Sequence, residues 1–251
     1  MFFSTVQNNL KREDYSFNLE RFKAENESSD DLFFNITMQL AKCENEDIAT
    51  DFCNKHYNPF FVFCKDSHVR QQFGIKIKTN AGTLNYHKQI FNNWKKLVNH
   101  ATQAGFKGHE AKKCWFTVSF NKDNIIDETI LRKIDLFMIN NYEYFKKLSR
   151  RERNNYSLSN NKMHNELGIN QRDNDAIKYN QNNIAFNFFR STLKAETILS
   201  TIEICHSVVH YLKDREIIFD DLYDNNSSVF RGYKNFINNY EYLSNYARRF
   251  D

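Results

Sequence analysis

Three side chains that could bind a metal ion or transfer protons are spaced to lie on one side of a single helix. Glu203, His206 and His210 are separated by three and four residues, within a segment, 184–215, that we predict to be one long helix. A carboxylate and two imidazoles in this arrangement suit Zn²⁺, Fe or Mn²⁺, or a general base oriented by a carboxylate. They are therefore the candidate catalytic and metal-binding residues, and the cofactor they imply is a divalent metal ion.

The apolar residues of the same segment indicate a different use for this stripe. On a helical wheel, one cluster lies roughly opposite the Glu and His side chains: Ile198, Ile202, Cys205, Val209 and Leu212. Such a helix normally turns its apolar side to the core and its Glu and His side chains to water. We therefore expect a solvated polar face, which becomes a site only if residues 149–175 or the final helix cover it.

A second candidate site is a run of cations that ends beside an aromatic residue. Its members are Lys146, Lys147, Arg150, Arg151, Arg153 and Tyr156. Cations stabilise the C-terminus of a helix, which accounts for part of this run. The excess, next to an Asn-rich stretch, suits a backbone of phosphates with the tyrosine as a stacking platform. This segment is the candidate site for nucleic acid or another anion.

The cysteines suggest weaker sites. Five soft or borderline metal ligands fall within 26 residues: Cys43, Cys53, His56, Cys64 and His68. Among them the close spacing of structural zinc ligands occurs once, between Cys53 and His56. Cys114 could act as a nucleophile, but it starts a predicted strand and not a helix. The odd number of cysteines and their uneven spacing favour a reducing compartment.

Composition narrows the class of protein. The chain of 251 residues contains 24 Phe and 13 Tyr but only six Gly and one Pro, which disfavours collagen-like, propeller and disulfide-scaffold folds. Asn, Lys, Ile, Phe and Tyr are enriched together, as an A/T-rich coding sequence would produce. The sequence shows no signal peptide and no apolar run that would span a membrane. We expect a soluble cytoplasmic protein, in its own cell or in a host cell.

Charge is distributed unevenly along the chain. Residues 1–55 contain 6 Lys and Arg against 11 Asp and Glu, whereas the remainder contains 29 against 20. A basic body behind an acidic leader is compatible with an anionic partner, or with pairing inside the molecule.

Hydrophobic periodicity predicts a helix-dominated α+β fold with a few short strands within residues 58–120 and a helical C-terminal half. The expected strands are 59–64, 73–78 and 114–120. The expected helices are 5–24, 31–43, 46–55, 84–104, 125–148, 184–215 and 229–249. We predict an α/β part at 1–148, a mobile basic and Asn-rich connection at 149–175, and a helical part at 176–251 that shares its core with the first.

These observations favour a soluble intracellular protein that binds a macromolecular partner, first of all another protein. Its surface would be rich in Asn, Tyr and Arg, a composition that suits interfaces, and an effector or accessory factor of an A/T-rich microbe, virus or mobile element fits the composition.

Two alternatives stay open. One is a metal-dependent hydrolase or nuclease that uses Glu203, His206 and His210. The other is a nucleic-acid-binding accessory protein that uses the basic segment 146–156. The sequence does not decide whether the protein is an enzyme or what its oligomeric state is.

Overall fold

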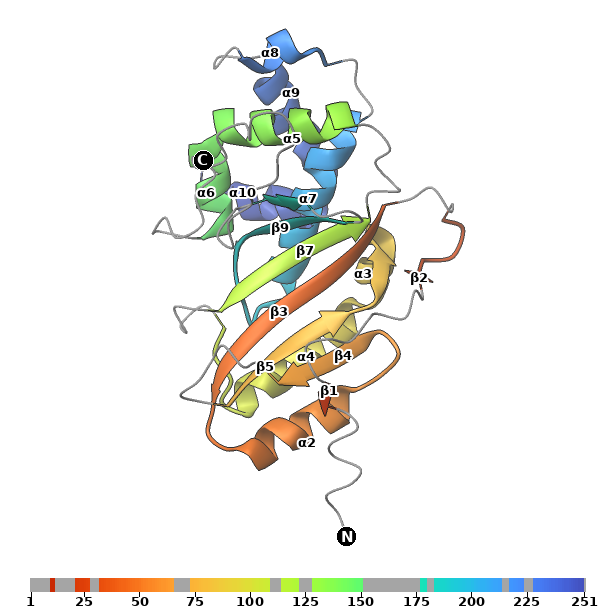
Figure 1. Ribbon diagram of the computed structural model, residues 1–251, viewed down its shortest axis with the longest axis vertical. Helices are drawn as coiled ribbons and strands as arrows, with labels where there is room; N and C mark the ends of the chain where they lie inside the picture. The colour runs from red at the N-terminus through yellow and green to blue at the C-terminus, as the bar shows by residue number, and fades with distance from the viewer. Residues whose placement is uncertain are drawn as a thin grey trace. The chain divides into compact units, whose positions relative to one another are not determined.

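The computed structural model (Figure 1) describes residues 10–11, 21–27, 32–65, 73–108, 114–121, 128–150, 177–179, 183–213, 217–223 and 228–250. The chain divides into two compact units. Unit 1 comprises Met1–Phe120 with Arg190–Ala195, and unit 2 comprises Asn121–Phe189 with Glu196–Asp251. Sheet and helices occur in both, so the fold class is α+β.

Unit 1 is built on a mixed sheet in which β1, β4, β5, β3 and β7 follow one another, while β6 pairs with both β3 and β2. Its strands are Leu10–Lys11 (β1), Arg21–Phe22 (β2), Phe33–Cys43 (β3), Phe61–Lys65 (β4), Phe73–Thr79 (β5), Ala81–Thr83 (β6) and Trp115–Asn121 (β7). The pairings β3–β5, β4–β5 and β3–β7 are antiparallel, whereas β1 pairs with β4 and β2 pairs with β6 in parallel. The predicted strands at 59–64, 73–78 and 114–120 are confirmed as β4, β5 and β7.

The central strand β3 was predicted as a helix, and that prediction is wrong. Phe34, Ile36, Met38 and Leu40 are all fully buried, which is the two-residue period of a strand. The helical prediction rested on apolar residues four apart, and a spacing of four satisfies the period of a strand as well as that of a helix. Pairing with β5 on one side and β7 on the other supplies the backbone hydrogen bonds that select the strand.

Three helices belong to unit 1: Glu46–His56 (α2), Leu84–Gln89 (α3) and Phe91–Gln103 (α4). Helix α2 contacts β3, β5 and α4, and α3 contacts α4 and β6. The predicted helix 84–104 is divided at Ile90, and it ends before Gly105, whose φ of +80° favours glycine.

Unit 2 contains an antiparallel pair of strands and a group of helices (Figure 1). The strands are Ile177–Tyr179 (β8) and Asn183–Arg190 (β9). The helices are Glu128–Asn140 (α5), Tyr142–Ser149 (α6), Ala195–Lys213 (α7), Phe219–Tyr223 (α8), Ser228–Phe236 (α9), the 3₁₀ turn Ile237–Asn239 (η4) and Glu241–Ala247 (α10). None of the described helices has the length and apolar character needed to cross a membrane.

The long helix predicted from residue 184 begins only at Ala195, because 183–190 form β9. Ile184, Phe186 and Phe188 are buried at a period of two, and aromatic side chains favour a pleated, half-buried surface. The C-terminal half is therefore not purely helical, and a helix-dominated fold is not confirmed.

Two other predicted helices are interrupted at asparagines. Helix 125–148 divides at Asn141, whose side-chain amide donates to the Phe137 carbonyl at 2.8 Å and so competes with the helical backbone. Helix 229–249 divides at the 3₁₀ turn, which contains Asn238 and Asn239. Where the structure describes the predicted helix 5–24, Leu10–Lys11 and Arg21–Phe22 are strands, so the prediction is wrong there; the rest of it lies outside the described residues. The connection 149–175 lies outside the described residues except for Ser149 and Arg150. The division of the chain into 1–148 and 176–251 stays a prediction.

Candidate functional site

Helix α7 carries the three candidate catalytic residues and is the most deeply buried helix segment that the structure describes in unit 2. Its apolar residues are buried, and so are its polar residues Ser200, Glu203 and Ser207. The Glu203 side chain is 0% exposed. Its carboxylate therefore lies in the interior and not on the solvated face that the helical wheel indicated.

Polar side chains along one side of α7 bind the segment from α9 to α10. The Ser200 hydroxyl donates to the Tyr242 carbonyl at 3.0 Å. One carboxylate oxygen of Glu203 accepts a hydrogen bond from the Leu243 backbone N–H at 2.6 Å. We call the set Ser200, Glu203, His206, Ser207 and His210 the α7 polar stripe.

The middle of the stripe joins α7 to α9. The hydroxyls of Ser207 and Tyr233 are 2.9 Å apart and share a hydrogen bond. Burial raises the pKa of Tyr233 well above its usual value, and the nearby Tyr144 adds to the rise, while the bond to Ser207 opposes it. Tyr233 therefore stays protonated and serves as a neutral hydrogen-bonding group.

The two histidines of the stripe are half-buried and lie against aromatic rings of the same segment. His206 Nδ1 is 2.8 Å from the Tyr240 hydroxyl. The His210 ring stacks on His206, at 5.4 Å between centroids, and on Phe236, at 5.6 Å. The final helical segment thus covers this face, so the expectation of a solvated face was wrong for Glu203.

Glu203 is buried because the α9–α10 segment packs against this side of α7, and the residues of α7 alone do not show that contact. Residues 200, 203, 207 and 210 are spaced three, four and three apart, and so are Phe230, Tyr233, Ile237 and Tyr240. The second set spans α9, the 3₁₀ turn and the residue before α10, so this side of α7 meets several short segments that come together only in the folded chain. Ser200 and Ser207 were missed as members of the stripe, and this matched spacing is the signal that could have found them.

The covering of this face does not assemble a metal site among the residues that the structure describes. No group of three or more His, Cys, Asp and Glu side chains in that part of the chain is placed to hold a metal ion. One oxygen of Glu203 is directed to the α10 backbone, and His206 Nδ1 faces a phenol. The metal-binding and catalytic roles of these residues stay predictions.

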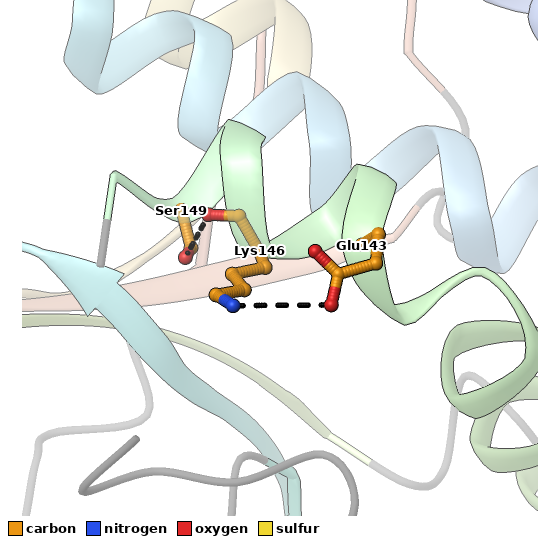
Figure 2. A network of polar contacts seen from close by, with 3 residues as sticks. All are labelled: Glu143, Lys146 and Ser149. Atoms are coloured by element: carbon orange, nitrogen blue, oxygen red, sulfur yellow. Dashed lines mark hydrogen bonds and ion pairs between the residues drawn. The ribbon is translucent and has the colours of Figure 1, made fainter. Parts of the chain in front are cut away.

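The second candidate site begins on α6, where Lys146 forms two contacts (Figure 2). Its ammonium group lies 3.8 Å from the Glu143 carboxylate, and its backbone carbonyl accepts a 2.8 Å hydrogen bond from the Ser149 hydroxyl. The same ammonium lies over the Tyr142 ring, 5.4 Å from its centroid. Lys147 is exposed beside it.

Arg150 ends α6, and Tyr246 of α10 lies near it. Arg150 adopts the left-handed conformation at φ +61° and its N–H donates to the Lys147 carbonyl. Tyr246 of α10 donates from its hydroxyl to the Leu148 carbonyl at 3.4 Å. Burial raises the pKa of Tyr246, while the positive charges of Arg150 and Arg249 oppose this, so both guanidinium groups act on the same phenol.

Helix α9 adds a further cation beside α6. Lys234 lies over the rings of Tyr144, at 5.4 Å, and Phe230, at 5.8 Å, and those rings contact each other edge to face. Seven cations follow α6, α9 and the end of α10, against the two carboxylates Glu143 and Glu241: Lys146, Lys147, Arg150, Arg231, Lys234, Arg248 and Arg249. We call these seven residues the basic surface. Of the predicted set, Arg151, Arg153 and Tyr156 lie outside the described residues.

The cysteines are buried and unoxidised. All five are free thiols with side chains in the interior. Burial raises the pKa of Cys53 to about 12, and the neighbouring Cys43 and Cys64 add to the rise. The Cys43 thiol faces the carbonyls of Asn45 and Ala104, each at 3.5 Å. His68 of this predicted cluster lies outside the described residues, His56 is half-exposed, and the three cysteines pack as small apolar side chains.

Comparison with known proteins assigns no relative to this fold. No family model matches the chain, and neither a curated protein nor a solved structure matches it.

Proposed function

We propose that the protein binds an anionic macromolecule through the basic surface of unit 2, and that single-stranded nucleic acid is this ligand. The observation that carries the proposal is that the Arg249 guanidinium lies over the Tyr246 ring, 5.7 Å from its centroid, while the Tyr246 hydroxyl donates to the carbonyl of Leu148, two residues before Arg150. These residues belong to a set in which seven cations outnumber two carboxylates. Arginine and lysine groups along one surface neutralise phosphates and release counterions, which supplies affinity without sequence preference.

Aromatic rings beside these cations support a single-stranded ligand. Tyr142, Tyr144 and Phe230 are half-exposed, and each has a lysine ammonium over its ring. Proteins that bind single strands combine such rings, on which bases stack, with cations that follow the phosphates. Arg151, Arg153 and Tyr156 follow Arg150 closely in the sequence.

A protein partner is the competing possibility. Within the described residues, the large apolar side chains that stand exposed are Tyr57 and Ile218, one in each unit. Support for a macromolecular partner therefore comes from charge rather than from an apolar patch, and an acidic protein would be recognised by the same cations.

The test compares two variants that each remove two exposed cations. In K147Q/R249Q the cations come from the basic surface, and in K95Q/K96Q they come from α4 of unit 1. Anisotropy of a labelled oligothymidine, measured from about 50 mM salt upward, gives the affinity and its salt dependence. We expect K147Q/R249Q to bind more weakly and to reduce the salt slope by about 2, since each lost phosphate contact lowers it by about 1. K95Q/K96Q should bind as the unmodified protein does.

Three results would overturn the proposal. They are no binding at about 50 mM salt, equal effects of the two variants, and binding of polyglutamate in preference to oligothymidine. The last result would assign the surface to an acidic protein. Circular dichroism of each variant shows that its fold is retained.

A further inference from the structure

Two histidines of unit 1 meet at the ends of neighbouring helices. His56 is the last residue of α2, and His100 lies in the last turn of α4. His56 Nε2 and His100 Nδ1 are 2.8 Å apart, and both side chains are half-exposed. The pair therefore joins two helices and is accessible from solvent.

The facing nitrogens of the two rings can each present a lone pair to a metal ion. Burial lowers the pKa of His56 to about 4, and the positive charges of His100 and Lys55 contribute further. In a neutral pair, the bridging hydrogen belongs to one ring, and that ring can carry it on its outer nitrogen instead, which leaves both facing nitrogens with a lone pair.

We propose that His56 and His100 form a binding site for a divalent transition-metal ion, with Cu²⁺ as the preferred ion. When two nitrogens each lie about 2.0 Å from one ion and subtend a right angle at it, the nitrogens are about 2.8 Å apart. At the tetrahedral angle the same two nitrogens are about 3.3 Å apart. The observed 2.8 Å separation matches the right-angled arrangement. Tetragonal nitrogen sites are typical of Cu²⁺, which also binds most strongly among the divalent ions of this series.

The helix ends add a favourable field for a cation. The C-terminus of a helix carries a partial negative charge, and both histidines lie in the last turn of a helix, of 11 residues in α2 and 13 in α4. The metal ion would sit where these two partial charges meet.

Aromatic packing holds the first imidazole in place. The Phe52 ring contacts His56 at 4.8 Å between centroids and Phe106 at 5.2 Å, so His56 is held against the core from behind. Because α2 and α4 also contact each other directly, the two ligands are positioned before a metal ion arrives. Water would complete the coordination, since the described residues contain no group of three or more metal-ligating side chains.

The experiment titrates Cu²⁺ into chelator-treated full-length protein at pH 7.5 and records pulsed electron paramagnetic resonance. The unmodified protein should bind one equivalent with the signature of two coordinated imidazoles. H56Q and H100Q should each weaken Cu²⁺ binding by roughly tenfold or more, because loss of even a group that only supports a metal ligand costs about that much affinity. N54Q and N99Q, which alter exposed residues of the same two helices, are the matched controls and should bind as the unmodified protein does.

The proposal is overturned by absence of binding, by a single-imidazole signature, or by unchanged binding in H56Q and H100Q, which would place the ion at other residues. Near-ultraviolet circular dichroism checks that the variants are folded. If H56Q does not fold, H100Q together with the imidazole signature of the unmodified protein decides the outcome. Because the site lies in unit 1, its failure would leave the nucleic-acid proposal for unit 2 unaffected.

Discussion

The Glu203 carboxylate accepts a 2.6 Å hydrogen bond from the backbone N–H of Leu243, forty residues further along the chain. Leu243 is the third residue of α10, so its N–H belongs to the first turn, where helical N–H groups have no acceptor within their own helix. Glu203 thus caps α10 from α7. The negative charge is placed where the helix dipole of α10 favours it.

Removal of this cap should destabilise the fold. We expect Glu203→Ala to lower the free energy of unfolding by about 2–3 kcal/mol, because a charge-assisted hydrogen bond is lost and a buried donor remains. Glu203→Gln keeps an oxygen acceptor and should cost less. Urea denaturation measures both.

The exposed Glu196 on the same helix is the control, and Glu196→Gln should change stability by no more than about 0.5 kcal/mol. Equal stability of E203A and the unmodified protein would show that the cap contributes nothing.

Gly232 of α9 is required by the close approach of Tyr211. A Cβ at position 232 would collide with the Tyr211 hydroxyl, which donates to the Val229 carbonyl at 2.8 Å. Alanine normally favours a helix over glycine by about 1 kcal/mol. We expect G232A instead to be destabilising by about 1–3 kcal/mol, as for an overpacked core.

The double variant G232A/Y211F should recover part of that loss, because the hydroxyl that collides is gone. Thermal unfolding of the four proteins of this cycle gives the coupling free energy, and we expect about 1 kcal/mol. Strict additivity would contradict the collision.

The stability of the protein should fall in mild acid because of His87. Burial lowers the pKa of His87 from 6.5 to about 4, and the backbone of Phe34 offsets only part of this effect. The unfolded chain therefore binds a proton at His87 that the folded protein does not bind. This contribution is fully present above pH 6.5 and is lost as the pH falls towards 4.

A pKa difference of this size corresponds to roughly 3 kcal/mol for a fully buried group. Urea denaturation between pH 7.5 and 4.5 should give a shallower loss of stability for H87Q than for the unmodified protein. The carboxylates titrate equally in both proteins, so parallel curves would exclude a contribution from His87.

The thiols should be unreactive in the folded protein. All five cysteines are buried, and burial raises the pKa of Cys53 to about 12 and that of Cys205 well above its usual value. A thiol reacts through its thiolate, which is scarce at pH 8 under these conditions. Ellman's reagent should therefore detect no thiol in the native protein and five in denaturant. A thiol that reacts rapidly in the native protein would contradict this prediction and support the hypothesis of a nucleophilic cysteine.

Local patterns were sufficient for several elements. Strict alternation of apolar and polar residues, as in Phe73–Thr79, identified β5, and alternation also identified β7. A glycine with φ of +80° marked the end of α4. These features depend on the backbone preferences and side-chain period of a few neighbouring residues, which the sequence displays directly.

The pattern at residues 33–43 was insufficient because it satisfied two periods at once. Leu32, Ile36 and Leu40 share one face of a helix, and Ile36 and Leu40 equally share one face of a strand. Pairing of β3 with β5 and β7 made the choice, through backbone hydrogen bonds to residues about 40 and 80 positions away.

The sequence by itself determined that Glu203, His206 and His210 lie on one side of a helix, because helical geometry aligns residues three and four apart. Only the tertiary structure decided what that side faces. The α9–α10 segment covers it, and the Glu203 carboxylate binds a backbone N–H that becomes its neighbour only when the chain folds. A helical wheel ranks the faces of one helix by polarity, whereas burial depends on the partner that packs against each face.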